Sequence, residues 1–569
     1  MNMLNPFKLR SRREAAGIAI QGSAKSGSGR ARNRLFMAMG VVFAIYGAIG
    51  VRLVQLGMTE EPVVNLPQSR PTASRPDILD RNGEVLATDI KTASLFAEPR
   101  RIVDIDEAIE KLQTVLPDLN YNQTYRRLDS QAGFVWLRRQ LSPRQQADIL
   151  ALGVPGLGFR TEKRRFYPGG ATASHILGLV NIDNKGIAGM EKYIDDQGLA
   201  DLQALGLAGP DTLEPVKLSI DLRAQYILHD ELSGALERYH AKAAGGVVLN
   251  ARTGEVLAMA SLPDYDPNNP YNALEKDRLN RMSAGVFEMG STFKLFTTAM
   301  ALDSGKVGLN STFDASRPLR VGRFTINDFH GKRRVLTVPE VFIYSSNIGT
   351  AKMAEVVGVA GHRDFLKRTG LLDRMRTELP EVAHPTEPKE WKQLNSYTIS
   401  YGHGVATTPL QTAVAAVAMV NGGKLIPPTF LMRSEEQAMQ VAEQVISPDT
   451  SAKIRYLFRL NVEKGSGSRA GVPGYYVGGK TGTAEKVVNG RYANDKRFNA
   501  FLAAYPSNDP DYVVAIVIDE PEPERPGIGA TSGLNTAPVA GNVIRRTAAL
   551  LGVKPDFGQE SEALLVSYQ

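Results

Sequence analysis

Three short polar motifs in the C-terminal half of the chain have the residue types of an acyl-transfer site. A serine hydroxyl becomes a good nucleophile when a neighbouring base removes its proton, and a lysine whose pKa is lowered can be that base. A Ser-x-x-Lys motif places both groups on one face of a helix. The motifs therefore predict a serine nucleophile that is activated by lysine instead of histidine. They comprise Ser291 and Lys294, then Ser345 and Asn347, then Lys480, Thr481, Gly482 and Thr483.

The residues around the first two motifs indicate how these groups are positioned. The apolar run after Lys294 predicts that Ser291 opens a helix, whose free N–H groups can stabilise a developing oxyanion. We expect Lys480 to be a second ammonium group that lowers the pKa of Lys294. Ser345 would relay a proton to a leaving amine, and Asn347 would hold a substrate carbonyl. Both residues are expected on a loop before a helix.

The third motif is predicted to form a strand at the edge of a sheet. Gly482 permits the close approach of a ligand backbone. Thr481 and Thr483 share one face of the strand, because side chains alternate along it, and are candidates to bind a substrate carboxylate. Taken singly, the three motifs also fit a surface helix pair, a helix cap and a turn. Their joint occurrence in this order favours the catalytic interpretation.

The composition excludes several function classes. The chain has 67 Lys and Arg against 60 Asp and Glu, and the whole excess of +7 lies in residues 1–34. The folded part is thus formally neutral, and we expect no nucleic-acid binding. There is no cysteine, which excludes disulfides, thiolate metal sites and a cysteine nucleophile. The seven histidines include no pair spaced by four residues, so we predict no metal and no cofactor.

A stretch without charged residues, 35–51, follows the basic segment and continues past Arg52 to Gly57. Roughly 20 apolar residues are enough to cross a bilayer as a helix. A cleaved signal peptide is the main alternative, but the run is long and lacks a small-x-small cleavage site. A buried core helix is disfavoured by the arginines before the run. The positive-inside rule then predicts a single-pass anchor with everything after residue 57 outside the cytoplasm. We expect the membrane to be the inner membrane and the catalytic domain to lie in the periplasm.

The remaining sequence predicts an α+β protein of two folded parts, the second with an antiparallel sheet covered by helices. Hydrophobic periodicity predicts a hairpin at Asn82-Gly83 and a second hairpin over 245–268. The predicted helices are 104–118, 141–152, 291–304, 338–357 and 409–420, and a buried strand is predicted at 512–521. The predicted divisions are a basic cytoplasmic tail over 1–34, an anchor over 35–57, a non-catalytic domain over 58–215, a catalytic domain over 216–555 and a tail over 556–569.

With these motifs the chain resembles a class B penicillin-binding protein from the anchor to about residue 545. Four further segments carry the resemblance: LDRNGEVLA (79–87), RRFYPGG (164–170), YGHGVATTPLQTA (401–413) and VGGKTGTAEK (477–486). The resemblance implies a dimerisation-type pedestal domain followed by a D,D-transpeptidase domain. Such an enzyme cross-links peptidoglycan stem peptides through a serine acyl-enzyme and is inhibited by β-lactams. The division-specific, septal type is the nearest match. The elongation type, a β-lactamase-like enzyme and a non-catalytic penicillin-binding sensor are the alternatives.

The resemblance also implies residue roles and partners. It implies that Ser291 is the nucleophile, that Lys294 is the base, and that Lys480 tunes the electrostatics. The backbone N–H groups of Ser291 and Thr483 would form an oxyanion hole. The partners it implies are stem peptides of lipid II-derived glycan strands, β-lactam antibiotics, the membrane, a membrane glycosyltransferase and other divisome proteins. Two residues depart from the family pattern, because Met289 and Pro76 stand where proline and glycine are usual.

Overall fold

The structure is a computed structural model that describes residues 36–37, 39–51, 75–199, 213–488 and 491–557. The chain divides into two units, residues 1–70 and 71–569. In the first unit, residues 39–51 are helical. Among all the residues described, no helix is long and apolar enough to span a membrane. The predicted anchor extends beyond the described residues at both ends, the predicted tail over 1–34 lies outside them, and so does most of the tail over 556–569.

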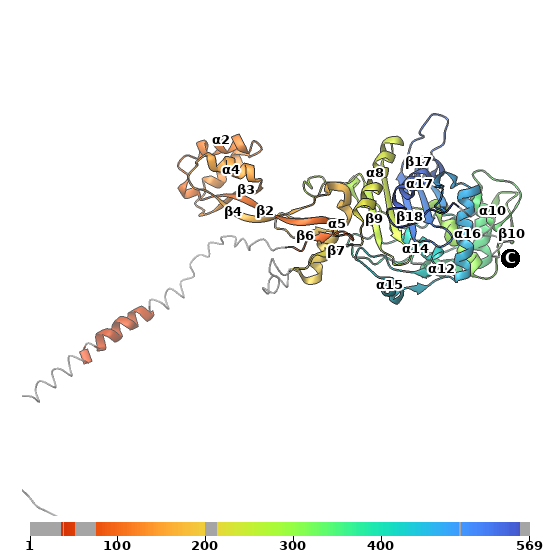
Figure 1. The fold of residues 1–569 in the computed structure, drawn as a ribbon, viewed down its shortest axis with the longest axis horizontal. Helices are drawn as coiled ribbons and strands as arrows, with labels where there is room; N and C mark the ends of the chain where they lie inside the picture. The colour runs from red at the N-terminus through yellow and green to blue at the C-terminus, as the bar shows by residue number, and fades with distance from the viewer. Residues whose placement is uncertain (1–35, 38, 52–74, 200–212, 489–490, 558–569) are drawn as a thin grey trace, which may run out of the picture. The chain divides into compact units, whose positions relative to one another are not determined.

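The N-terminal part of the second unit is built on one long strand, β2 (Figure 1). Strand β2 pairs antiparallel with β1, β3 and β4. Gly83, at φ 96°, closes the β1–β2 turn in a conformation that favours glycine, and the hairpin predicted there is confirmed. These strands are β1 (Ile78–Leu79), β2 (Val85–Ala97), β3 (Val135–Leu141) and β4 (Leu157–Phe166).

Three helices cover one end of this sheet and form a small core with it. Each begins at a side chain that accepts a hydrogen bond from the first turn: Asp104, Asn120 and Ser142. The helices predicted over 104–118 and 141–152 are confirmed with shorter bounds. The middle helix was not predicted, because its eight residues are mostly polar and only Thr124 and Leu128 are buried. The helices are α2 (Ile105–Val115), α3 (Tyr121–Leu128) and α4 (Pro143–Ala151).

A buried ion network fixes the other end of this domain. Glu191 accepts hydrogen bonds from Arg165 at 2.6 Å and from Arg75 at 2.8 Å, and all three side chains are almost fully buried. Arg165 also pairs with Asp89 at 3.3 Å and donates to the carbonyl of Pro76 at 2.8 Å. The unusual proline therefore takes part in the network. Loss of one charge would leave its partners uncompensated inside the protein.

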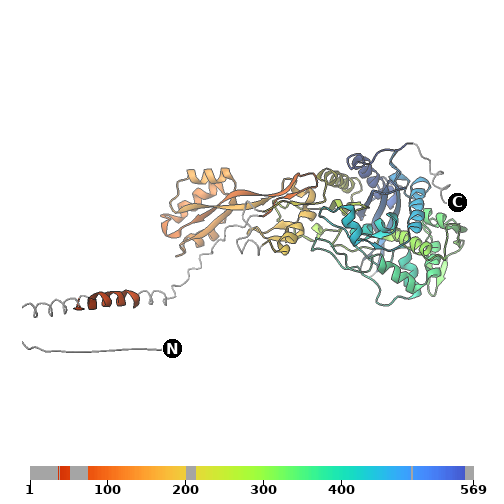
Figure 2. The same cartoon turned by 60° about the horizontal axis from the view of Figure 1, so that its bottom comes forward.

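A five-stranded antiparallel sheet, in the order β16-β17-β18-β8-β9, forms the centre of the C-terminal domain (Figure 2). The predicted hairpin over 245–268 and the strand over 512–521 are both present. Strand β16 carries the Lys-Thr-Gly motif and lies at the sheet edge, as predicted. The strands are β8 (Ala243–Asn250), β9 (Val256–Leu262), β16 (Gly478–Val488), β17 (Arg491–Tyr505) and β18 (Tyr512–Asp519).

Helices cover both faces of this sheet, which explains the continuous apolar run of β18. Alternate residues of the strand enter two different cores. Val514 and Ile516 pack with α8 and α17, whereas Val513 and Ala515 face the larger cluster that contains α9 and α14. These helices are α8 (Leu222–Arg238), α9 (Phe293–Asp303), α14 (Pro409–Val420), α16 (Pro448–Lys464) and α17 (Thr536–Thr547).

The helix predicted over 338–357 is wrong as one element. It is interrupted at Ser345, whose φ of 53° lies in the left-handed region, just after the first of two shorter helices has ended. Two helices result, and the predicted helix over 409–420 is confirmed as α14. The surrounding helices are α10 (Val338–Ile343), α11 (Asn347–Val357), α12 (Val359–Arg368) and α13 (Gln393–Ser400).

Shorter elements complete the description. They are η1 (Pro99–Arg101), η2 (Gly170–Ala173), α5 (Ser174–Leu177), β5 (Leu179–Val180), β6 (Gly186–Ala188), α6 (Gly189–Ile194), η3 (Asp195–Leu199), β7 (Val216–Lys217), η4 (Lys276–Arg278), η5 (Gly290–Thr292), β10 (Thr312–Asp314), β11 (Leu319–Val321), β12 (Phe324–Ile326), β13 (Val335–Thr337), β14 (Lys424–Leu425), α15 (Glu435–Val441), β15 (Glu443–Gln444), η6 (Ser468–Ala470) and η7 (Ser532–Leu534).

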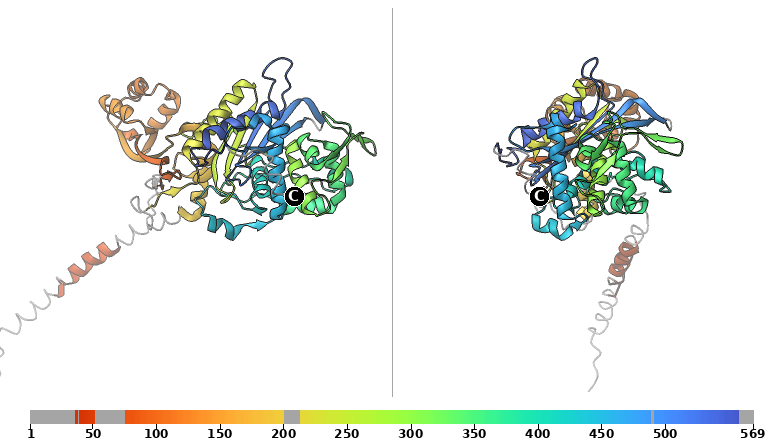
Figure 3. Two further views of the ribbon diagram at one scale, coloured as in Figure 1. Left: turned by 45° about the vertical axis from the view of Figure 1, so that its right-hand side comes forward. Right: turned by 90° about the vertical axis from the view of Figure 1, so that its right-hand side faces the viewer.

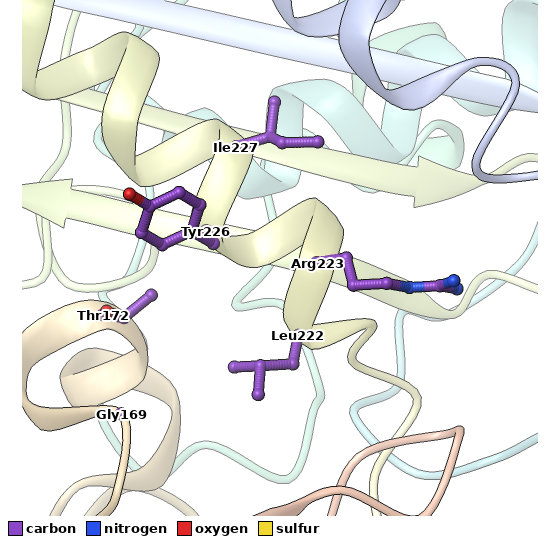
Figure 4. Close-up of a pocket in the computed structure, with 6 residues that line it drawn as sticks. All are labelled: Gly169, Thr172, Leu222, Arg223, Tyr226 and Ile227. Atoms are coloured by element: carbon purple, nitrogen blue, oxygen red, sulfur yellow. The ribbon is translucent and has the colours of Figure 1, made fainter.

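A mostly apolar hollow of 460 Å³ lies between η2 and the first turns of α8 (Figure 4). The exposed ring of Tyr226 lies on one side of it and the turn at Thr172 on the other. None of the residues that line it belongs to the three motifs. The motifs therefore come together elsewhere, at the edge of the central sheet.

Candidate active site

Two buried lysines from different elements converge on one serine hydroxyl. Lys294 on α9 donates to the Ser345 Oγ at 3.0 Å and to the Ser345 carbonyl at 2.5 Å. Lys480 on β16 donates to the same Oγ at 3.1 Å and to the Thr481 carbonyl at 3.3 Å. Both lysine side chains are almost fully buried. The structure thus brings together one residue from each of the three motifs.

Burial changes the acid–base properties of both lysines. It lowers the pKa of Lys480 to about 7, because the charged form loses its hydration. The pKa of Lys294 is also lowered well below its usual value, first by burial and then by repulsion from Lys480. The carboxylate of Asp328 opposes this shift only in part. A neutral Lys294 beside a charged Lys480 is therefore an accessible state near neutral pH, as a general base requires.

Ser291 lies in the single-turn helix η5, immediately before α9, and its side chain is half-buried. The turn is packed directly against β16. Gly290 has a φ of 53°, and a Cβ added to it would lie 2.7 Å from the Thr483 carbonyl oxygen. A Cβ on Gly482 would lie 2.5 Å from the carbonyl oxygen of Met289. Only glycine at these two positions lets the serine turn and the Lys-Thr-Gly strand approach so closely.

Met289, which stands where the family usually has proline, does not disturb the serine turn. Its φ of −83° is close to the value that proline imposes, and its side chain is buried. Its carbonyl accepts a hydrogen bond from the Thr292 hydroxyl at 2.8 Å. We therefore expect the backbone that leads into the serine turn to differ little from that of relatives with proline at this position.

The two serines of the serine–asparagine motif have different roles, which the sequence did not reveal. Ser346 is the helix cap: it accepts from Gly349 N–H and donates to Asp328 at 2.8 Å. Ser345 is thereby left to face the lysines. Asn347 was predicted on the loop, but it is the first residue of α11, where its side chain donates to the Asn327 carbonyl at 2.9 Å.

The two threonines of the third motif lie on the same strand face, as predicted, and the hydroxyl of each has a hydrogen-bond partner. The Thr481 hydroxyl is 2.6 Å from the Ser466 hydroxyl, and the Thr483 hydroxyl accepts from the Ser532 N–H at 3.1 Å. Asn461 on α16 supports this arrangement by donating to the Gly479 carbonyl at 2.8 Å. Contacts within the protein thus hold both hydroxyls in place.

A group of residues beside the site was missed by the sequence analysis. Glu288, three residues before Ser291, accepts from the Gly404 N–H at 2.7 Å and from the Tyr492 hydroxyl at 3.3 Å. The ring of His403 packs edge-to-face against Tyr492, with the ring centres 5.4 Å apart. Burial, together with the charge on Lys294, lowers the pKa of His403 to about 4, so the imidazole is neutral. We call Glu288, Gly404 and Tyr492 the clamp.

The clamp joins three segments that are distant in the sequence. Its members lie on the segment before η5, on the segment between α13 and α14, and on β17. The only sequence feature that pointed to this contact was the pair of glycines at 402 and 404. The structure explains the first of them, since a Cβ on Gly402 would lie 1.9 Å from the Gly290 carbonyl oxygen. This segment is therefore packed onto the serine turn.

Two long segments of the chain match known protein families. Residues 244–545 match the penicillin binding protein transpeptidase domain, and residues 70–209 match the penicillin-binding protein dimerisation domain. Together the two matches cover most of the chain and leave the segment before residue 70 aside.

Individual proteins agree with the family match. The chain is 41% identical over 495 residues to a protein named probable peptidoglycan D,D-transpeptidase FtsI from Caulobacter vibrioides, covering 84% of this chain and 82% of that protein. It is 34% identical to the probable peptidoglycan D,D-transpeptidase PenA of Neisseria gonorrhoeae, covering 92% and 93%. The solved transpeptidase domain of Burkholderia pseudomallei penicillin-binding protein 3 superimposes with a TM-score of 0.54 at 32% identity, covering 60% of this chain and 98% of that chain.

The fold and the lysine–serine site therefore define a penicillin-binding protein with a transpeptidase domain. The chain belongs to the class B penicillin-binding proteins, in which a dimerisation domain precedes the transpeptidase domain.

Proposed function

We propose that this protein is a peptidoglycan D,D-transpeptidase that cross-links stem peptides during septal wall synthesis. The observation that carries the proposal is the convergence of Lys294 and Lys480 on Ser345, beside the turn that holds Ser291. Such an arrangement supplies a base with a lowered pKa and a second cation in one buried cluster, next to the turn that carries the nucleophile. The names of the Caulobacter and Neisseria relatives support the same activity.

In the first half-reaction, the Ser291 Oγ attacks the carbonyl between the last two residues of a D-Ala-D-Ala stem. Neutral Lys294 takes the hydroxyl proton as the new ester bond forms. The peptide C–N bond then breaks, and the leaving D-alanine receives a proton through the Ser345 hydroxyl, which both lysines contact. The products are an acyl-enzyme on Ser291 and free D-alanine.

In the second half-reaction, the amine of another stem attacks the ester carbonyl. The C–O bond to Ser291 breaks, the serine regains a proton, and a cross-linking amide is formed. Asn347 would position the substrate carbonyl, and the backbone N–H groups of Ser291 and Thr483 would stabilise the oxyanion in both steps. The hydroxyls of Thr481 and Thr483 would bind the carboxylate of the donor stem or of a β-lactam.

We further propose a single-pass anchor over residues 35–57, with the pedestal domain (58–215) and the transpeptidase domain (216–555) in the periplasm. The uncharged run after a basic segment supports the anchor and its orientation. A membrane glycosyltransferase and other divisome proteins would be the partners, as membership of the class B penicillin-binding proteins implies.

Two measurements test the proposal. Purified protein should join two stem peptides with release of D-alanine, and it should form a long-lived adduct with penicillin. Steady turnover of nitrocefin would instead indicate a β-lactamase. A fluorescent fusion should localise at midcell, and depletion should yield filaments. Lateral-wall localisation with rounded cells would assign the elongation role.

A further inference from the structure

Residues 317–334 form an exposed basic segment beside the serine–asparagine motif. The segment leaves the domain between the paired strands β10 and β13, and its β11–β12 hairpin turns at Gly322. Figure 3 shows this green hairpin and the blue β16–β17 hairpin projecting from the domain side by side. The segment thus projects from the domain next to the hairpin that carries the Lys-Thr-Gly motif.

The basic segment is attached directly to residues of the site. The carbonyl of Asn327 accepts from the Asn347 side chain at 2.9 Å. The carboxylate of Asp328 accepts from the Ser346 hydroxyl at 2.8 Å and from the Ile348 N–H at 3.0 Å. These contacts hold Asn327 and Asp328 against the serine–asparagine motif. The one carboxylate of the segment is therefore hydrogen-bonded to the start of α11.

The charge of the basic segment is strongly unbalanced. It contains six arginines and lysines against one acidic residue, in a protein whose folded part is formally neutral. Only Arg334 has an ion-pair partner within the described part of the chain, namely Glu340 at 2.6 Å. The other five cations are exposed and make no ion pair with the described residues. These five are Arg317, Arg320, Arg323, Lys332 and Arg333.

Aromatic side chains are interspersed with these cations. Phe324 is 61% exposed and Phe329 is 76% exposed. The Lys332 ammonium lies 4.6 Å from the ring centre of Tyr344, the residue immediately before Ser345. Gathered like charges repel one another and lower stability unless an anion binds them, and exposed aromatic residues next to them add contact area for a ligand. This combination indicates a binding surface for an anionic chain molecule.

We propose that the basic segment binds the free carboxylates of the acceptor stem peptide and so directs its amine toward the acyl-enzyme on Ser291. This inference rests on the proposed transpeptidase function and assigns it an acceptor subsite. The segment takes no part in the bond changes: the amine attacks, the ester bond to Ser291 breaks, and the serine regains a proton. It acts by raising the occupancy of the acceptor and by orienting it.

The test uses the full-length protein and a thioester donor that acylates Ser291 without needing an acceptor. Two acceptors are compared, an acidic stem peptide and its carboxamide analogue, and the readout is the ratio of aminolysis to hydrolysis. The altered protein carries Arg320→Gln, Arg323→Gln and Arg333→Gln. A control protein with the same change in charge carries Arg238→Gln, Arg545→Gln and Lys554→Gln, at exposed positions on other elements.

The substitutions in the basic segment should lower the ratio for the acidic acceptor about tenfold, the effect of three exposed ion pairs of ordinary strength. The carboxamide acceptor and the rate of penicillin acylation should be unaffected. High salt should weaken the preference of the unaltered protein.

An unchanged ratio, or an equal fall for both acceptors, would overturn the inference. It would also be overturned if the control protein lost the preference equally, or if the substitutions only reduced binding to anionic vesicles or to an acidic partner protein. If the unaltered protein failed to react with penicillin, the proposed function itself would be refuted, and this result is distinct from a loss of acceptor preference alone.

Discussion

Lys294 and Lys480 present their ammonium nitrogens to the same oxygen, the Ser345 Oγ, at 3.0 and 3.1 Å. Two buried ammonium groups so placed cannot both keep a proton at neutral pH without a large cost. They therefore titrate as a coupled pair. The reactive state is the one in which Lys480 is protonated and Lys294 is neutral. This relationship links the electrostatics of the site to its chemistry.

The pair predicts a bell-shaped pH dependence of penicillin acylation. The acidic limb reports protonation of the base, Lys294, and the alkaline limb reports loss of the charge on Lys480, whose pKa is about 7. Lys480→Arg keeps a positive charge at every accessible pH. In this variant the alkaline limb should disappear and the acidic limb should remain, as measured by the second-order rate constant for fluorescent penicillin from pH 5 to 10.

Lys480→Gln is the matched control for this profile. It removes the charge, so acylation should be slow at all pH values, on the order of a hundredfold below the unaltered protein. An unchanged alkaline limb in Lys480→Arg would contradict the assignment of that limb to Lys480.

The buried lysines also predict how stability depends on pH. In the unfolded chain Lys480 keeps its proton up to about pH 10.4, whereas in the folded protein its pKa is about 7. The unfolded state therefore binds more protons between these values, and stability must rise with pH across this window. Lys480→Met has no titrating group at this position and therefore lacks this pH-dependent contribution to stability.

The melting temperature of the unaltered protein, relative to Lys480→Met, should consequently increase between pH 7 and pH 10. It would be measured by differential scanning fluorimetry in one buffer series at constant ionic strength. A difference that stays constant across this range would show that Lys480 keeps its ordinary pKa in the folded protein.

Glycine at position 290 is predicted to be required by packing as well as by backbone conformation. Gly290→Ala would place a Cβ 2.7 Å from the Thr483 carbonyl oxygen at a φ of 53°. Gly305→Ala is a matched control, because Gly305 has a φ of 69° but nothing within 4 Å of the added carbon.

Both variants should lose roughly 1 kcal/mol of stability to backbone strain. Gly290→Ala alone should also slow penicillin acylation by more than about tenfold, because it displaces the nucleophile from the strand. Equal acylation rates in the two variants would show that the close approach of this turn to β16 is not needed for the reaction.

The clamp is predicted to hold the β17 segment in place beside the nucleophile. Glu288→Ala removes the acceptor for both Gly404 and Tyr492, and acylation should fall on the order of tenfold, about the value of one or two lost hydrogen bonds. Tyr492→Phe removes one of the two bonds and should have a smaller effect.

Glu288→Gln retains an oxygen that accepts from the Gly404 N–H and should keep most of the activity. Rate constants for acylation would be compared at pH 7.5, with melting temperatures as a check on folding. If Glu288→Gln were as slow as Glu288→Ala, the carboxylate charge would be the important property, and the positional role would be wrong.

Much of this site was predictable because its residue types and spacing are constrained by chemistry. The Ser-x-x-Lys pair requires a helix after the serine, and the Lys-Thr-Gly strand requires an edge, and both are present. By contrast, the sequence Ser345-Ser346 offers two hydroxyls. Only the left-handed conformation of Ser345 and the cap made by Ser346 decide which one faces the lysines.

The features that were not predicted depend on tertiary packing. The clamp joins three segments that no local pattern connects, so its hydrogen bonds became visible only in the folded chain. The interruption at Ser345 was missed for a similar reason, because a serine does not favour a positive φ by itself. It is held there by contacts with both lysines and by one backbone hydrogen bond, from the Ser345 N–H to the Phe342 carbonyl.

The most direct test of the account is to locate the acyl group. The full-length protein would be treated with penicillin, digested, and examined by peptide mass spectrometry. The account predicts a single penicilloyl adduct on the peptide that contains Ser291, and no adduct in Ser291→Ala, while Ser345→Ala forms the same adduct more slowly. An adduct on Ser345, or acylation that persists in Ser291→Ala, would contradict the central claim.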